Sequence, residues 1–446
     1  VESSEAESMS KAVISSRREN LTNNEYGPYS IHNNWRVPVL LPEIPKSSTA
    51  PPVAREWLRD LLRQHSQNCQ TPIDLKDKAL IVAPMVDQSD LPFRMQCRKY
   101  GSNLCVTPMI HTRLFQDNEA YRNKFRCDNL PACDRPILAQ LCGPDPSVIL
   151  KTALEIAPFV DGIDLNCGCP QGIAKRGLYG AFLLEEPDLL LSIVHTLVSN
   201  LDIPVTVKVR LLPSGLDDSL RLYTKLVDAG ISMLTVHGRT RLQTQRQTGS
   251  SDWDAVRTVV RELGSRIPIV ANGGIASLAD VRSCLAYTGA DGVMSSEALL
   301  EYPALFVDET FPHRRSGPGR LQLAREYLEL ARRYPPEEGG QGSGFKTIQA
   351  HVHKFLHEDL QRDPDFRTIC VEAETMKELE DCLSALEKLQ LKEEHDVTCE
   401  KLAWYRRHRD REIPVLSHGV RYIEIADDTA DCFAGLFGTD DDEEDL

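Results

Sequence analysis

The chain has 446 residues, of which 41% are hydrophobic and 26% are charged, and its formal net charge is −15 at pH 7. This balance is typical of an ordinary globular protein and excludes a wholly disordered chain. No apolar run approaches the roughly 20 residues that cross a bilayer, and the first residues lack a signal-peptide core. We therefore expect no membrane insertion and a cytoplasmic or nuclear location, in which the 13 cysteines stay reduced.

The two ends of the chain differ in composition from its middle. Residues 1–75 are rich in Ser, Asn and Pro, which predicts an irregular and partly disordered extension. Within it, residues 53–65 place Trp57, Leu58, Leu61 and Leu62 on one face of a short docking helix. Ten acidic residues follow Arg421 with no further Lys or Arg, and without them the formal charge is −5. We expect residues 413–446 to be an acidic, disordered tail, so the total charge does not decide whether the folded part binds nucleic acid.

Between these ends, short apolar runs alternate with segments of helical pattern. The runs cover residues 79–85, 103–108, 136–141, 162–166, 204–211, 233–238, 268–273 and 292–296. Such alternation indicates parallel βαβ units. Eight units within residues 76–318 predict an α/β fold of the (β/α)8 TIM-barrel type, with a doubly wound sheet as the alternative.

After Gly319 the strand pattern stops. Residues 321–334, 345–359, 373–391 and 398–408 have helical patterns, with breaks at residues 335–344 and 363–365. We predict a C-terminal α-helical bundle domain over residues 319–412.

Several predicted strands end in polar residues that suit a ligand, among them Gln140, Asn166, Lys208 and His237. In a TIM barrel the carboxyl ends of the strands form the active site. A Lys beside a His suits an electron-rich ring such as a flavin, or a phosphate. The alternative is that Lys208 reaches solvent and His237 only caps a strand. The glycines after Asn272 would let backbone N–H groups approach a phosphate.

The turn after the fourth strand contains Cys167 and Cys169, and a Gly-rich segment with Lys175 and Arg176 follows it. We interpret this segment as a lid with a catalytic thiol, because a thiol with an ordinary pKa is mostly protonated at neutral pH and can donate a proton. Cys169 is the candidate, whereas Cys167 is closer to the strand and suits the core. A zinc site at this pair is disfavoured, since no second pair completes the usual spacing.

Basic residues cluster in two further places. One cluster, after the sixth strand, is Arg239, Arg241 and Arg246. The other lies at the end of the helix predicted over residues 398–408 and just beyond it, and consists of Trp404, Tyr405, Arg406, Arg407, Arg409 and Arg411. Arg interleaved with aromatic residues suits phosphate contact and base stacking on RNA, although a solvated helix end is an alternative. His351, His353 and His357 include a pair spaced for zinc, but core packing or RNA contact fits better without a third ligand, so we predict no metal.

Taken together, these stretches resemble the dihydrouridine synthase family, and in particular its eukaryotic branch that acts on uridines 16 and 17 of the tRNA D-loop. The matching stretches are VAPMVD (82–87), QLCG (140–143), DLNCGCP (164–170), VKVR (207–210), VHGRT (236–240) and ANGGI (271–275), with KFLH (354–357) and WYRRHR (404–409) in the helical region.

The resemblance implies a flavin enzyme that reduces the C5=C6 bond of uridine in tRNA, with NADPH or NADH as reductant. We expect a monomer with no obligate protein partner. The resemblance also implies FMN bound by Pro84, Met85, Val86, Gln140, Lys208, His237, Asn272, Gly273 and Gly274, and Cys169 as proton donor. It implies tRNA contacts by Asn166, Lys175, Arg176, Arg239, Arg241, Arg406, Arg407 and Arg409. Many flavin barrels have Gly-Arg after the eighth strand, whereas Ser295, Ser296 and Glu297 stand here, so we expect Ser296 and Glu297 to take over phosphate binding.

Two other functions are compatible with the sequence. An FMN barrel that reduces a small pyrimidine would not need the Arg-rich helix or the basic lid. A tRNA-binding homologue without turnover would not need Cys169, Lys208 and His237.

Overall fold

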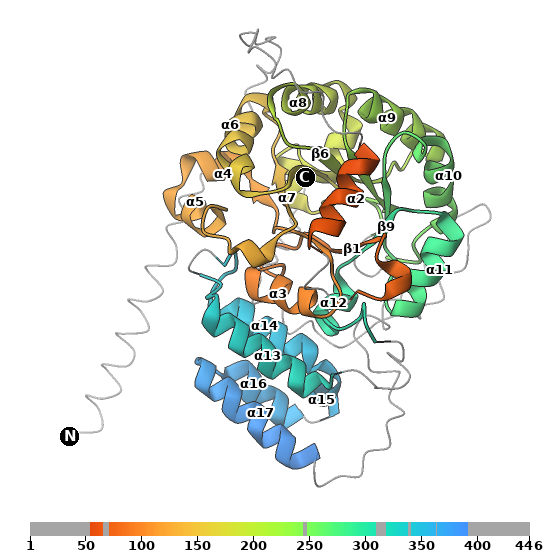
Figure 1. Cartoon of the computed structure of the whole chain (residues 1–446). Helices are drawn as coiled ribbons and strands as arrows, with labels where there is room; N and C mark the ends of the chain where they lie inside the picture. Colours follow the sequence, from red (N-terminus) through yellow and green to blue (C-terminus); the bar gives the residue numbers. More distant parts are fainter. Residues whose placement is uncertain are drawn as a thin grey trace, which may run out of the picture. The chain divides into compact units, whose positions relative to one another are not determined.

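Eight parallel strands surrounded by helices close into a barrel in the computed structural model of the chain (Figure 1). The strands are β1 (Ala79–Val82), β2 (Leu104–Val106), β4 (Ile137–Cys142), β5 (Gly162–Cys167), β6 (Val205–Leu211), β7 (Met233–Thr240), β8 (Ile269–Asn272) and β9 (Gly292–Ser295). A pairing of β2 with β4 closes the order β2-β1-β9-β8-β7-β6-β5-β4, and the two-residue β3 (Ile110–His111) pairs with the end of β4. The predicted (β/α)8 barrel is confirmed, and each apolar run contains one of its eight strands.

The structure describes residues 54–65, 71–243, 248–308, 318–337, 340–362 and 364–390, all within the unit Lys46–Leu446. Several expectations lie outside these residues. They are the extension up to residue 53, Arg246, the helix predicted over residues 398–408, the cluster of Arg406, Arg407 and Arg409, and the acidic tail.

Helices cover the outside of the barrel. They are α3 (Leu91–Lys99), α4 (Thr112–Asp117), α5 (Glu119–Phe125), α6 (Pro146–Ile156), α7 (Gly172–Arg176), α8 (Pro187–Asn200), α9 (Leu216–Asp228), α10 (Trp253–Leu263), α11 (Leu278–Thr288) and α12 (Glu297–Glu301). Five begin at a side chain that accepts from free backbone N–H groups, namely His111 before α4, Asn118 before α5, Asp145 before α6, Asp252 before α10 and Ser277 before α11. Strands β4 and β5 are buried at every position, as expected for strands covered on both faces.

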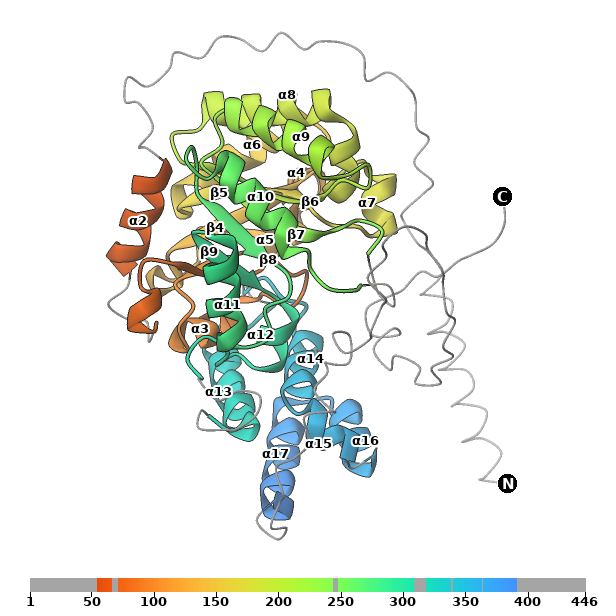
Figure 2. The same cartoon turned by 90° about the vertical axis from the view of Figure 1, so that its right-hand side faces the viewer.

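Helix α2 (Ala54–His65) closes the end of the barrel at which the strands begin. Its apolar face, Trp57, Leu58, Leu61 and Leu62, is buried in one cluster with Ala79, Ile81, Leu104, Leu138, Met233 and Val270 of the strands. Arg55 Nη1 also donates to Asp291 Oδ1 just before β9, over 2.6 Å. Figure 2 shows α2 and α7 at opposite ends of the barrel. The predicted docking helix is thus confirmed, and it seals the barrel interior on the side away from the strand carboxyl ends.

Five helices follow the barrel within the described residues: α13 (Arg320–Arg333), α14 (Phe345–Phe355), α15 (His357–Arg362), α16 (Pro364–Glu372) and α17 (Met376–Gln390). The helix expected over residues 345–359 is broken at Leu356. The interruption expected at residues 363–365 falls between α15, which ends at Arg362, and α16, which begins at Pro364, and residue 363 lies outside the described residues. Helix α16 itself was not predicted, and Pro364 opens it because proline fits the first turn of a helix, where its missing N–H costs nothing.

A buried ion pair joins these helices to the barrel. Arg320 Nη2, at the start of α13, donates to Glu301 Oε1, at the end of α12, over 2.6 Å, and the two side chains are only 4% and 2% exposed. Removing one partner of such a pair leaves the other charge buried and unpaired, which destabilises the folded protein. Helix α13 also packs against α3 and α14. The five described helices after the barrel, which we call the helical segment (residues 318–390), therefore share a continuous core with the barrel.

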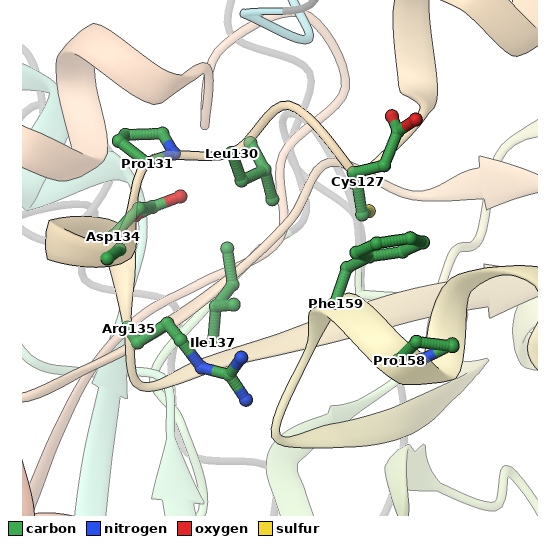
Figure 3. A pocket seen from close by; sticks show the side chains of 10 residues that line it. Cys127, Leu130, Pro131, Asp134, Arg135, Ile137, Pro158 and Phe159 are labelled. Atoms are coloured by element: carbon green, nitrogen blue, oxygen red, sulfur yellow. The ribbon is translucent and has the colours of Figure 1, made fainter.

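One cavity of about 200 Å³ lies where β4 begins, not where it ends. Figure 3 shows Cys127, Leu130, Ile137 and Phe159 around it. Its place at the amino ends of the strands separates it from the polar residues described below. Among the described helices, none is long and apolar enough to cross a membrane.

We expect Trp57→Ala to lower the free energy of unfolding by about 3–5 kcal/mol, because it leaves a void against the barrel interior. Urea denaturation measures this loss. The matched control is Arg59→Ala on the exposed face of the same helix, which should change stability by about 0.5 kcal/mol or less. Equal effects of the two substitutions would show that α2 does not seal the barrel.

Candidate active site

Polar side chains gather at the carboxyl ends of the strands. Gln140 lies in β4, Asn166 in β5, Lys208 in β6 and His237 in β7, while Asn272 ends β8. The pairing registers place Asn166 opposite Lys208 and His237 opposite Asn272, while Gln140 is opposite Asp164. Five residues predicted from separate stretches of sequence therefore line one end of the barrel, where TIM-barrel chemistry takes place.

A buried carboxylate lies among these residues. Asp164 Oδ2 accepts a hydrogen bond from Gln140 Nε2 (2.8 Å), and Asp164 Oδ1 accepts one from Thr206 Oγ1 (2.6 Å). Burial raises the pKa of Asp164, whereas the bonds from Thr206 and Gln140 and the charge of Lys208 lower it. Sequence reasoning missed Asp164 and Thr206. The alternation of a strand was the available signal, since each lies two positions before a predicted site residue.

Basic side chains crowd the same end of the barrel. Burial, and then the charge of Arg210, lower the pKa of Lys208 to about 8. Burial and the charge of Arg239 lower the pKa of Arg210 to about 10. The pKa of His237 lies well below its ordinary value because of burial and of the charges of Arg210, Lys208 and Arg239. At neutral pH the site therefore holds several cations around an uncharged imidazole, which favours an anionic or electron-rich ligand.

Two arginines are fixed by carbonyl groups. Arg210 donates from Nε to Gly168 O (2.7 Å) and from Nη1 to Thr240 O (2.9 Å). Arg239 Nη2 donates to Gly249 O (2.8 Å), and its Nη1 lies 3.1 Å from His237 Nε2. Arg210 is a site residue that sequence reasoning missed, although it lies two positions after Lys208 on the same strand face. The tRNA contact predicted for Arg239 stays a prediction.

The backbone after β8 approaches its neighbours too closely for a side chain. Gly273 has a φ of +97°, and a Cβ there would lie 2.8 Å from Ser251 Oγ and 2.9 Å from His237 Cδ2. Gly274 also has a positive φ, of +78°, and Trp253 Nε1 donates to Gly273 O over 3.1 Å. Only glycine fits this turn, so bare backbone lies next to His237.

Cys169 is held at the edge of the cationic cluster. Asn166 Oδ1 accepts hydrogen bonds from the backbone N–H groups of Gly168 and Cys169, each over 3.1 Å, and Ala181 N donates to Cys169 O over 2.9 Å. Burial raises the pKa of the Cys169 thiol, while a backbone hydrogen bond from Gln171 and the charges of Arg210 and Lys208 lower it. Cys169 is thus half-buried and protonated at neutral pH. Asn166, predicted to contact tRNA, uses its side chain to form this turn.

Cys167 differs from Cys169 in its exposure and its surroundings. Its side chain is completely buried in the main hydrophobic core, and burial raises the pKa of its thiol. The assignment of Cys167 to the core is confirmed.

The other predicted residues surround this centre. Lys175 and Arg176 are exposed on α7, and Ile173 and Leu178 next to them are exposed apolar side chains. Arg241 donates to Glu185 Oε1 over 2.7 Å and lies over the ring of Phe182. This pairing occupies one donor of the side chain, and its predicted contact with tRNA stays a prediction.

The first and last strands bring further predicted residues to this end. Pro84 and Met85 are half-buried after β1, and Val86 is exposed. Ser296 and Glu297 follow β9, and the carboxylate of Glu297 is near enough to Arg210 to raise its pKa.

The three histidines predicted to pack or to contact RNA lie in α14 and at the start of α15. His351 is buried and bonded to Asp90, with 2.7 Å between Nε2 and Oδ1. The rings of His353 and His357 are 6.4 Å apart. Within the described ranges, no group of three or more His, Cys, Asp and Glu side chains is arranged to hold a metal ion.

The sequence model of the dihydrouridine synthase (Dus) family matches residues 81–393, which is more than half of the chain. This chain belongs to the dihydrouridine synthase family. The resemblance inferred from the motifs is therefore confirmed. The match begins in β1 and runs through the barrel and all five helices that follow it.

Curated relatives extend this finding. The chain is 40% identical over 301 residues to the tRNA-dihydrouridine(16/17) synthase [NAD(P)(+)] of Schizosaccharomyces pombe, covering 67% of this chain and 74% of the relative. It is 40% identical over 319 residues to the tRNA-dihydrouridine(16/17) synthase [NAD(P)(+)]-like protein of Mus musculus, covering 71% of this chain and 63% of that protein. The tRNA-dihydrouridine synthase B of Serratia marcescens is 32% identical over 335 residues, which is 96% of its length.

We expect Lys208 to titrate near pH 8 rather than near 10.5, because burial and Arg210 disfavour its charge. Raising the pH through 8 then removes one positive charge from the site, and affinity for an anionic ligand falls. NMR of protein with ¹³C-labelled lysine side chains measures the titration, and loss of one signal in Lys208→Met assigns it. An assigned signal that titrates above pH 10 would contradict the burial of this ammonium group.

Proposed function

We propose that this protein is a flavin-dependent tRNA-dihydrouridine synthase, which uses FMN and NADPH or NADH to reduce uridines 16 and 17 of the tRNA D-loop. The observation that carries the proposal is the position of the half-buried Cys169 thiol, in a turn that Asn166 and Arg210 hold at the cationic end of a Dus-family barrel. The names of relatives support the use of NAD(P) and the tRNA substrate. Relatives named for positions 20a and 20b reach only 35% identity in yeast, which favours positions 16 and 17.

The residues present fit FMN. Lys208 and neutral His237 would donate to the electron-rich pyrimidine side of the flavin ring. The close approach of Ser251, His237 and Trp253 requires glycine at positions 273 and 274, and the backbone N–H groups of this turn after β8 would suit a phosphate. The hydroxyl of Ser296 and the backbone N–H of Glu297 would complete the phosphate site after β9. Pro84, Met85 and Val86 would contact the ring from the loop after β1.

FMN held by Lys208, His237 and the turn after β8 would supply, in its reduced form, the hydride for C6 of the uracil. The chain must then supply the proton for C5, which leaves a saturated C5–C6 bond and a thiolate. Cys169 can hold this proton at neutral pH because burial raises the pKa of its thiol. Arg210 and Lys208 would stabilise the thiolate that remains, since both charges favour the deprotonated form of Cys169. Asn166 orients the turn by accepting the N–H of Cys169.

A uracil stacked inside tRNA must leave its stack to reach this site. The exposed cations Lys175 and Arg176 on α7 stand beside the turn that carries Cys169, and they would contact the phosphates around the extruded base. We assign Arg406, Arg407 and Arg409 to a second region of tRNA contact. Two such regions are what a macromolecular substrate requires, and they disfavour an enzyme for a small free pyrimidine.

The direct test uses unmodified tRNA, NADPH and three forms of the enzyme. The unaltered chain should form dihydrouridine at positions 16 and 17, detected by mass spectrometry of nuclease fragments. Cys169→Ala should lose at least about 100-fold in rate, because it removes the general acid, yet retain flavin and tRNA binding. Cys167→Ala is the matched control, and it should stay within a few-fold of the unaltered rate once its folding is verified.

Equal rates for Cys169→Ala and Cys167→Ala would show that another group donates the proton. Dihydrouridine at positions other than 16 and 17 would correct the proposed specificity while leaving the chemistry intact. Absence of dihydrouridine from a well-folded, flavin-loaded chain would instead favour a tRNA-binding homologue without turnover.

A further inference from the structure

The loop after β1, residues 84–90, is held from outside the barrel; we call it the β1 loop. Asp87 Oδ1 accepts a hydrogen bond from Ser343 Oγ, in the segment before α14, over 2.6 Å. It also accepts from Lys124 Nζ over 2.8 Å, and Lys124 Nζ is 2.8 Å from Ser343 Oγ. A carboxylate of the barrel, a lysine of α5 and a serine of the helical segment therefore meet at one point.

A second contact lies at the other end of the β1 loop and is buried. Asp90 is completely buried, and its two oxygens are bonded to His351 of α14 (2.7 Å) and to Tyr327 of α13 (3.0 Å). The ring of His351 stacks on Phe93 at 4.7 Å between centroids. Both polar partners of this buried carboxylate thus come from the helical segment.

Further bonds fill the space between these two points. Lys354 Nζ donates to Gln88 Oε1 over 2.5 Å. Arg94 Nη1 donates both to Ser89 O (2.6 Å) and to Gln341 Oε1 (3.0 Å). The side chains of Asp87, Gln88 and Asp90 and the carbonyl of Ser89 are accordingly all bonded outside the loop, and half of the six partners, Ser343, His351 and Lys354, come from the chain between Gly340 and Lys354.

The hydrogen bonds within the β1 loop join Met85 to Gln88 and Ser89. Met85 N donates to Ser89 Oγ over 2.9 Å, and Met85 O accepts from Gln88 N (3.2 Å), Ser89 N (3.0 Å) and Ser89 Oγ (3.1 Å), which closes a short turn but leaves the side chains of Asp87 and Gln88 to outside partners. Asp87 has a φ of +54°, a left-handed conformation that costs free energy for a residue other than glycine. Such a conformation persists only where surrounding contacts fix it, and here the contacts of Asp87 come from Ser343 and Lys124.

We propose that Ser343 and Lys354 of the helical segment are positioning residues for the cofactor, because they hold the β1 loop that presents Met85 and Val86. The helical segment is then part of the flavin site as well as a region that contacts RNA. Binding free energies are linked reciprocally, so flavin in the barrel also favours the bonded arrangement of the helical segment. This inference rests on the proposed function, since it takes FMN as the cofactor.

The test compares two double variants of the full chain. Ser343→Ala with Lys354→Met removes two bonds to the β1 loop. Ser384→Ala with Lys377→Met makes the same changes within α17, where Ser384 bonds to Glu380 and Lys377 to Asp381. The dissociation constant of FMN is measured on the apoprotein by quenching of flavin fluorescence, and the visible circular dichroism of the bound flavin is recorded.

We expect the first double variant to raise the dissociation constant for FMN about fivefold or more and to change the flavin's circular dichroism, because each lost bond loosens the loop. The α17 variant should stay within about twofold. Ser343→Thr with Lys354→Arg keeps the hydroxyl and the cation, so it should restore most of the affinity.

The outcomes separate this inference from the proposed function. Normal FMN binding by the unaltered chain and by the folded Ser343→Ala, Lys354→Met variant would overturn the positioning role alone. An equal loss in the α17 variant would also overturn it, since the effect would then come from general destabilisation. Failure of the unaltered chain to bind FMN would overturn the proposed function and this inference with it.

Discussion

The balance of charge around Asp164 is the constraint on which the barrel mouth depends. This one buried carboxylate links β4, β5 and β6 through Gln140 and Thr206 and lies near Lys208, whereas the cations Lys208, Arg210 and Arg239 surround His237 in the same site. The surplus of positive charge, together with burial, lowers the pKa of Lys208 and keeps His237 neutral. The repulsion between these buried cations costs free energy, and an electron-rich ligand would reduce it. The cluster of cations therefore favours binding of such a ligand.

The same charges connect the proposed cofactor site with the proposed proton donor. Cys169 lies in the turn after β5, and Arg210 donates to Gly168 O within that turn. Burial keeps the thiol protonated, while Arg210 and Lys208 favour the thiolate that proton transfer leaves. A barrel sealed by α2 at its other end confines this chemistry to the carboxyl ends of the strands.

Local patterns were sufficient to predict the barrel and the centre of the site, because each depends on residues within one strand and its turn. Lys208 and His237 were found in this way. Arg210 lies two positions after Lys208, and Asp164 lies two positions before Asn166. Both were missed because only one polar residue was considered at each strand end, whereas every second residue of a strand faces the same side. The contacts of the β1 loop could not be predicted, since Asp90 and His351 are 261 positions apart and no local pattern links them. Helix α16, which begins at Pro364, was not predicted because proline both ends and begins helices.

The most direct measurement of the central claim follows the flavin itself. The purified chain with bound FMN is reduced by NADPH without oxygen, and the visible flavin absorbance is then recorded after adding tRNA. We predict rapid reoxidation by tRNA that lacks dihydrouridine and little reoxidation by tRNA that is already fully modified. A chain that binds no flavin, or a reduced flavin that unmodified tRNA does not reoxidise, would contradict the account.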